Sequence, residues 1–200
     1  MRHDSLRDTM AAMMRDAGCS DVRTEPALLP VNPNDFSSRS NTTEGARLDI
    51  SARGLISTFE HTVNDVRVSH PYAKSNVTVS LKDLYSKNEK EKRDLYEERV
   101  IQAEKGSFEP LVFLTTGGTG PSCTKVIKRI AGKIAGRRGE EYSHVIGFMR
   151  GRLRFALLRS VLISIRGVRG KVMRDPPMNF LPFNLIPSWG TLCMNVKNYD

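Results

Sequence analysis

Two aspartates and an arginine in two strand-like segments are the residues of this sequence best placed to do chemistry. Asp49 lies in ARLDI (residues 46–50), and Asp65 and Arg67 lie in FEHTVNDVRV (residues 59–68). The second segment alternates in polarity and is rich in β-branched residues, which is typical of a strand. The two segments together predict a β-hairpin that carries both acids.

The predicted hairpin brings the two acids face to face. Arg53-Gly54 supplies a turn between the strands, and the hairpin midpoint near residue 57 is equidistant from Asp49 and Asp65. Directly opposed residues have Cβ atoms about 4.5–5.5 Å apart, where like charges repel. A divalent cation offsets that repulsion, and Mg²⁺ prefers carboxylates together with phosphate oxygens. The alternative is a solvated pair of acids without a metal.

Arg67 lies two residues beyond Asp65, so it projects from the same face of the strand. A cation there could hold a scissile phosphate or stabilise developing charge. Val66 and Val68 then face the core. The alternative is a surface Asp65–Arg67 ion pair, worth at most about 1 kcal/mol.

A helix predicted over residues 79–105 adds a second polar group. Lys92, Tyr96 and Arg99 lie at i, i+4 and i+7, on one helix face, and Asn88 extends that face. Such a stripe could grip phosphates. The alternative is an ordinary exposed face whose charge neighbouring glutamates balance.

The charge of +9 is unevenly distributed. Residues 1–120 carry 16 Lys and Arg against 18 Asp and Glu, whereas residues 121–174 carry 14 against 2. This asymmetry favours a polyanionic partner, with nucleic acid first and an acidic membrane surface second. A solvated basic face or an acidic protein partner stays open. The cations expected to contact nucleic acid are Arg99, Lys125, Lys128, Arg129, Arg137, Arg138, Arg150, Arg152 and Arg154.

Other site classes find little support in the sequence. GGTGPSCTK (residues 117–125) lacks the spacing of the P-loop and of the GxGxxG fingerprint, so we expect a tight turn there, with anion binding by free backbone N–H groups as the alternative. The three cysteines and four histidines form no zinc spacing, and no GxSxG motif occurs. His3 with Asp4 is expected to belong to the cap of the first helix. No apolar run approaches the roughly 18 residues of a membrane span, and the charged start is unlike a signal peptide.

The remaining patterns indicate a mixed α/β domain over residues 1–170, followed by a Pro-containing extended tail over residues 171–200. Helices are expected at 4–17, 79–105, 123–135 and 142–165, and strands at 21–24, 46–50, 59–68 and 110–116. Together they predict a central mixed sheet of about four strands flanked by helices.

The order of these motifs resembles a known family. RHDSLRD, RLDI with Asp49, DVRV with Asp65, NEKEKRDLY and the PLVF strand are similar to PD-(D/E)xK nuclease-like domains. In particular they resemble the restriction-like endonuclease domains of non-LTR retrotransposons and related animal mobile elements, which usually end a longer polypeptide. The resemblance covers roughly residues 2–170 and implies a restriction-endonuclease-like fold with a basic helical C-terminal part.

The resemblance also implies roles for individual residues. Asp49 and Asp65 would bind Mg²⁺ or Mn²⁺, with the Val66 carbonyl as a further ligand. Arg67 stands where the family pattern has lysine, and it cannot act as a general base because it stays protonated. In the retrotransposon branch the lysine moves to the helix, which makes Lys92, with Tyr96 behind it, the catalytic candidate. Asp8 corresponds to an additional acid that some members carry.

The sequence and the resemblance together predict a metal-dependent DNA endonuclease that is intracellular and nuclear, with RNA as a second possible substrate. A catalytically inactive, nucleic-acid-binding relic of the same fold is the first alternative. A basic module that binds an acidic protein is the second.

Overall fold

The computed structural model describes residues 2–166, so the extended tail predicted at 171–200 lies outside the described residues. Four helices and four strands build this part of the chain, with one short 3-10 turn at Pro33–Asp35. In chain order they are α1 (Arg2–Asp16), β1 (Ser20–Thr24), β2 (Ile50–Arg53), β3 (His61–Ser69), α2 (Leu81–Gln102), β4 (Ser107–Leu114), α3 (Pro121–Arg138) and α4 (Tyr142–Arg166).

The strands form one mixed sheet in the order β1-β2-β3-β4. The β1–β2 and β2–β3 pairs are antiparallel, and β3 and β4 are parallel. Parallel neighbours need a crossover connection, which α2 supplies between β3 and β4. The prediction of an α/β domain with a mixed four-stranded sheet flanked by helices is therefore confirmed.

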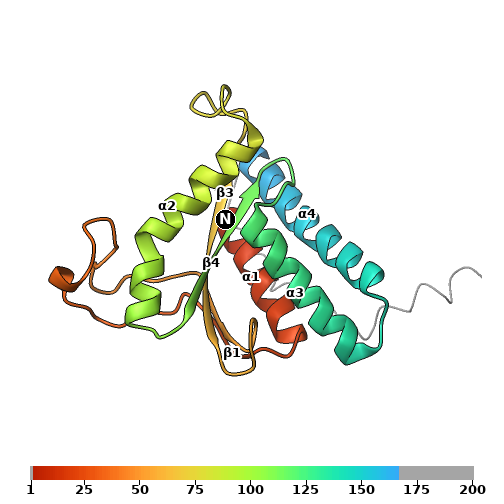
Figure 1. Ribbon diagram of the computed structural model, residues 1–200. Coiled ribbons are helices and arrows are strands. Elements are labelled where there is room, and N and C mark those ends of the chain that lie inside the picture. The colour runs from red at the N-terminus through yellow and green to blue at the C-terminus, as the bar shows by residue number, and fades with distance from the viewer. Residues whose placement is uncertain (1, 167–200) are drawn as a thin grey trace, which may run out of the picture. The chain divides into compact units, whose positions relative to one another are not determined.

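Helices cover both faces of the sheet (Figure 1). On one face, α1, α3 and α4 enclose the larger core, to which the sheet contributes residues such as Val66, Leu111 and Phe113. On the other face, α2 encloses a smaller core of residues such as Val63, Val100 and Phe108. Because side chains alternate along a strand, Asp65 and Arg67 share the α2 face with Val63.

The β2–β3 hairpin has the predicted register but a shorter first strand. Ile50 pairs with Asn64, a register that sets residue 49 opposite residue 65 when continued by one position. The predicted strand at 46–50 is wrong in its bounds, because β2 begins only at Ile50. Backbone hydrogen bonds join residues 46–48 to residues 26–28 instead, from Leu28 N to Ala46 O (2.9 Å) and from Leu48 N to Pro26 O (3.2 Å).

This divergence leaves a notch in the sheet. β3 continues to Ser69, while its pairing with β2 ends at Asn64. Within residues 2–166, the edge of β3 beyond Asn64 therefore has no strand beside it on the β2 side. The candidate site lies at this notch.

No helix among residues 2–166 combines the length and the apolar character needed to cross a membrane.

Candidate metal and phosphate site

Asp49 closes the notch with its side chain. Its Oδ2 accepts a hydrogen bond of 2.6 Å from the backbone N–H of Val66, which a continued β2 would otherwise have satisfied. The N–H and C=O of one strand residue point to the same side, so the Val66 carbonyl lies on this open edge as well. The local departure of β2 from the sheet thus brings a carboxylate and a backbone carbonyl together.

Asp65 meets a lysine from the helix on its own side of the sheet. The Lys92 ammonium lies 2.6 Å from Asp65 Oδ2, and both side chains are mostly buried, at 17% and 9% exposure. The contact is an ion pair, and within the described residues Asp65 Oδ2 has no hydrogen-bond partner. Burial raises the pKa of Asp65, the Lys92 ammonium opposes that rise, and the Asp49 charge adds to it.

His3 reaches the same site from α1, on the opposite side of the sheet. Its Nε2 lies 2.8 Å from Asp49 Oδ2, and its Nδ1 lies 3.3 Å from Asp4 Oδ1. The hydrogen bond to Asp49 raises the pKa of His3, which favours the imidazolium form beside the carboxylate. The sequence pattern predicted for His3 only a place in a helix cap. A contact across 46 residues has no local signal in the sequence that could have revealed it.

Tyr96 and Asn88 stand on the same inward face of α2 as Lys92. The Lys92 ammonium lies 5.6 Å from the centre of the Tyr96 ring, and that ring packs against Phe108. Asn88 is buried and bonds Ser69 Oγ and the Leu84 carbonyl. The i, i+4 spacing therefore forms a supporting face beneath the lysine, as expected from the sequence.

Arg67 pairs with a glutamate of α2. Its Nη1 pairs with Glu91 Oε1 at 2.8 Å, and its side chain is one-third exposed. No ion pair joins it to Asp65 in the described part of the chain. The structure thus pairs Arg67 with Glu91, and it pairs Asp65 with Lys92.

Arg99 lies in the protein interior, whereas a contact with nucleic acid requires an exposed side chain. It is fully buried, and its guanidinium donates to the carbonyls of Asn41, Thr43 and Leu29. The prediction that Arg99 contacts nucleic acid is therefore wrong: this arginine fastens the 28–46 segment to α2. The helical spacing correctly put it on the face of Lys92, but that face turns inward.

Asp8 also lies apart from the candidate site. Its side chain is 61% exposed and pairs with Arg7 at 2.9 Å. Arg7 in turn pairs with Glu25. Asp8 therefore belongs to a cluster of charges that joins α1 to Glu25, the residue after β1.

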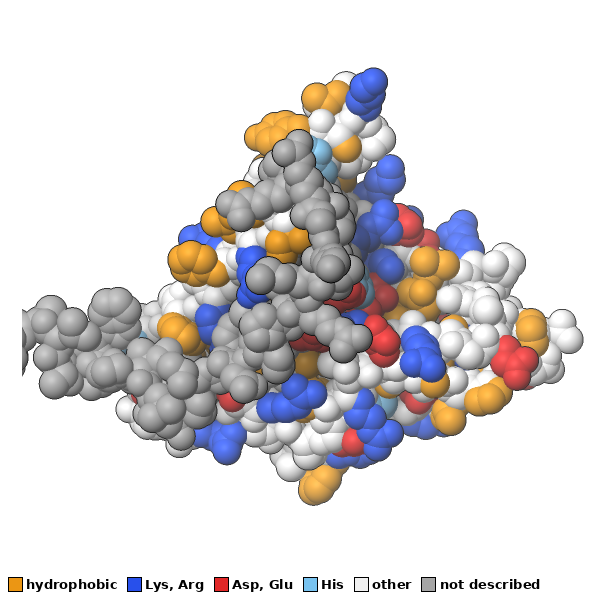
Figure 2. All heavy atoms as spheres, turned by 180° about the vertical axis from the view of Figure 1, so that it is seen from behind, with side chains coloured by type: hydrophobic (Ala, Val, Ile, Leu, Met, Phe, Trp, Pro, Cys, Tyr) orange, Lys and Arg blue, Asp and Glu red, His pale blue; other side chains and the backbone are white. Residues whose placement is uncertain are grey.

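The predicted nucleic-acid-binding cations on α3 and α4 fall into two groups. Some face carboxylates or carbonyls of the same domain: Arg152 and Arg137 approach Asp16 at 3.9 and 2.9 Å, while Arg129 and Arg138 lie 4.0 Å from glutamates. The second group is exposed and has no ion pair within residues 3–163, and it consists of Lys125, Lys128, Arg150 and Arg154. Figure 2 shows lysine and arginine side chains beside a central group of acidic ones on the face seen from behind.

The GGTGPS loop has a packing role that its sequence did not show. Glu89 of α2 accepts hydrogen bonds from the N–H (2.9 Å) and the hydroxyl (3.1 Å) of Ser122, at the start of α3. A Cβ at Gly118 would lie 2.2 Å from the Tyr85 hydroxyl oxygen, and one at Gly120 would lie 2.5 Å from Glu89. The glycines let α2 approach the loop, and a carboxylate of the same chain already occupies the start of α3.

No set of three His, Cys, Asp or Glu side chains in the described residues is arranged to hold a metal ion. A metal between Asp49 and Asp65 would therefore need oxygen ligands other than these side-chain types. The Val66 carbonyl, water and a phosphate are such ligands, and Mg²⁺ accepts all three. Two carboxylates with a backbone carbonyl form a hard oxygen donor set, which fits Mg²⁺ or Mn²⁺.

Comparison of the sequence with models of known protein families and with curated proteins finds no match.

Proposed function

We propose that this chain is a metal-dependent DNA endonuclease with a restriction-endonuclease-like fold of the PD-(D/E)xK type. The observation that carries the proposal is the meeting of three residues distant in sequence. Asp49 binds the Val66 N–H at a break in the sheet, near enough to Asp65 for its charge to raise the pKa of that residue, and the Lys92 ammonium lies 2.6 Å from Asp65 Oδ2. A mostly buried lysine paired with a mostly buried acid is a costly arrangement for stability alone, because each charge loses hydration.

The donor set at the notch supports a divalent cation, with Asp49, Asp65 and the Val66 carbonyl as the residues that would hold it. When bound, such an ion supplies Lewis acidity and an activated water for phosphodiester hydrolysis.

The other residues would act on the substrate. The Lys92 ammonium would contact a phosphate oxygen of the scissile group and stabilise the charge that develops there. Tyr96, under the ammonium, limits where Lys92 can move. Arg67 is held by Glu91, so we assign it a supporting role in which it contacts a neighbouring phosphate.

One observation favours a second candidate, a nucleic-acid-binding relic without catalysis. Both carboxylates already have cationic or hydrogen-bonding partners within the chain, with Lys92 beside Asp65 and His3 beside Asp49. A site neutralised in this way can persist without any metal. The presence of Arg67 where the family pattern has lysine is in line with such a loss.

Nicking of supercoiled plasmid DNA in Mg²⁺ separates the candidates. We expect the unmodified chain to nick, and Asp65→Asn and Asp49→Asn to lose activity by on the order of 100-fold or more. Asp35→Asn, which removes an exposed charge outside the site, is the matched control and should nick normally. Equal nicking by all four proteins would refute the role of the two acids. DNA binding without nicking in either Mg²⁺ or Mn²⁺ would select the relic.

A further inference from the structure

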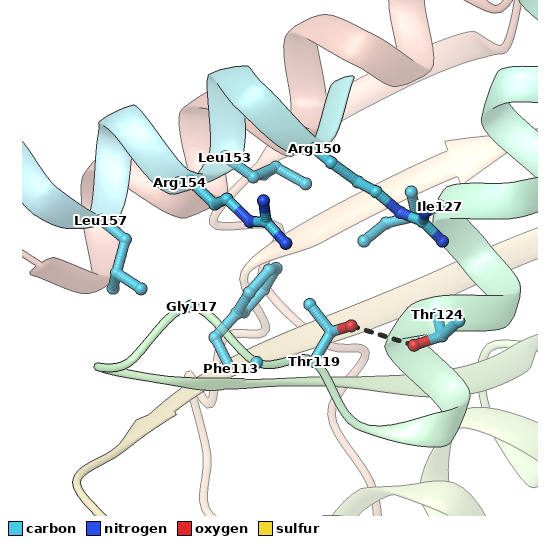
Figure 3. A pocket seen from close by; sticks show the side chains of 10 residues that line it. Phe113, Gly117, Thr119, Thr124, Ile127, Arg150, Leu153, Arg154 and Leu157 are labelled. Carbon is cyan, nitrogen blue, oxygen red and sulfur yellow. Dashed lines mark hydrogen bonds between the residues drawn. The ribbon is translucent and has the colours of Figure 1, made fainter. Parts of the chain in front are cut away.

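A cavity on the other side of the sheet from Lys92 is lined by two arginines that the proposed catalytic site does not include. It has a volume of about 230 Å³ and lies beyond the carboxyl end of β4, under α4 (Figure 3). Crevices beyond the carboxyl ends of parallel strands are common ligand sites in α/β sheets. The cavity lies on the face of Phe113, whereas Asp65 and Lys92 lie on the α2 face.

Two arginines from one turn of α4 form the basic wall of the cavity. Arg150 and Arg154 are four residues apart, and both extend from α4 toward the loop that bears Thr119 and the first turns of α3 (Figure 3). Both are exposed, and neither forms an ion pair within residues 3–163. Arg152, between them, instead approaches Asp16 and the Phe148 ring. Helix geometry therefore aims two of these three arginines at the cavity and turns the third away.

The opposite wall offers a hydroxyl donor and open space. The Thr119 and Thr124 hydroxyls are 2.9 Å apart and hydrogen-bond each other. One proton serves that bond, so the second hydroxyl proton is left for a ligand. Gly117 adopts φ +94°, and its missing side chain leaves the rim beside Arg154 open. The floor is apolar, formed by Phe113, Ile127, Leu153 and Leu157.

We propose that this cavity binds a phosphate group of a nucleic-acid strand, held between Arg150 and Arg154 with a threonine hydroxyl as an additional donor. Planar guanidinium groups match phosphate oxygens in geometry and charge. The start of α3 is not the binding element, because Glu89 already occupies it. The proposal rests on the proposed function only for the identity of the strand. It assigns that strand a second contact, on the other side of the sheet from the two acids.

The strand could present either an internal phosphodiester or a terminal phosphate. The shared chemistry is a phosphate anion with at least two free oxygens. Single-stranded 20-nucleotide DNA with a 5′-phosphate and with a 5′-hydroxyl distinguishes the two sources. A loss of affinity for both oligonucleotides points to an internal phosphate, and a loss confined to the phosphorylated one points to a terminus.

Fluorescence anisotropy in EDTA measures this binding without any metal-dependent reaction. We expect Arg150→Gln/Arg154→Gln to weaken binding roughly tenfold and to lower the slope of log affinity against log salt by about 1–2. Lys125→Gln/Lys128→Gln removes the same charge from exposed positions of α3 that do not line the cavity, so its effect should be clearly smaller.

Equal losses from the two double variants would overturn the cavity as a site, because they would reveal only a diffuse basic field. An unchanged affinity of the arginine variant for DNA, with loss of binding to a polyglutamate probe, would also overturn it in favour of an acidic protein partner. This experiment measures binding and not cleavage. Its result therefore does not depend on whether Asp49 and Asp65 support nicking.

Discussion

The chemistry of the candidate site depends on a few side chains whose charges balance one another. Asp65 is buried and its pKa is raised by that burial, yet Lys92 at 2.6 Å favours its ionised form. Asp49 Oδ2 is contacted both by the Val66 backbone N–H and by His3 Nε2. The two carboxylates therefore remain close without a metal because each has its own positive or hydrogen-bonding partner.

His3 makes the stability of the fold depend on pH. Its pKa lies above 6.5 in the folded chain because of its hydrogen bond to Asp49. A raised pKa means that the folded state binds the proton more tightly than the unfolded state. The resulting stabilisation is fully present below pH 6.5 and is lost as pH rises through the folded pKa of His3.

We therefore expect His3→Gln to flatten the fall in unfolding free energy as the pH rises above 6.5. Urea denaturation in EDTA at several pH values measures this effect. His144→Gln, which changes an exposed histidine outside the site, should retain the pH dependence of the unmodified chain. The same pH dependence in both variants would contradict the assigned role of His3.

The strands and α2 contain features that can be predicted from patterns in the sequence. Alternation and the turn at Gly54 correctly predicted the β2–β3 hairpin and its register, although the observed pairing begins at Ile50 and does not include Asp49. Helical spacing correctly grouped Lys92 with Tyr96. These patterns are local, and each follows from the geometry of one hairpin or one helix.

The remaining features depend on contacts between distant segments. β2 begins only at Ile50 because residues 46–48 bond to residues 26–28. The periodicity of the sequence does not show which of the two segments these residues will bond to. The direction of the Lys92 face likewise depends on how α2 packs, so Arg99 was placed on the surface instead of in the interior. Residue propensity and spacing predict helices, strands and the residues that share one face of each. Tertiary packing decides which of those faces is buried.

Arg99 provides a test of how α2 holds the long segment before β2. Arg99→Met removes donors to three carbonyls in a fully buried setting, so we expect a loss of about 3 kcal/mol in unfolding free energy. Chemical denaturation measures this loss. Lys90→Met, at an exposed position of the same helix, should change the stability by no more than about 0.5 kcal/mol. A loss of the same small size at Arg99 would contradict its role as an anchor.

Within the described domain, the basic residues expected to bind a polyanion lie on other elements than the residues proposed to hydrolyse it. Residues 121–166 carry eleven lysines and arginines against two glutamates, and they form the layer of α3 and α4. The acids of the candidate site and Lys92 lie elsewhere, at the notch and on α2. Affinity for a polyanion and hydrolysis are therefore expected to respond to different substitutions.

DNA affinity in EDTA should fall steeply with salt, by roughly 10³ between 50 and 200 mM if about six phosphates are neutralised. Asp65→Asn should retain the same salt slope, because it changes no cation of the α3–α4 layer. Anisotropy titrations of the two proteins at several salt concentrations measure both slopes. A shallow slope in the unmodified chain would argue against a nucleic-acid partner.

Isothermal titration of the chain with Mg²⁺ tests the central claim most directly, because the claim is that Asp49 and Asp65 form a cation site at the break in the sheet. We expect one saturable site in the unmodified chain, its loss in Asp65→Asn, and its retention in Asp35→Asn. Absence of Mg²⁺ and Mn²⁺ binding to the unmodified chain, or equal binding by all three proteins, would contradict the account.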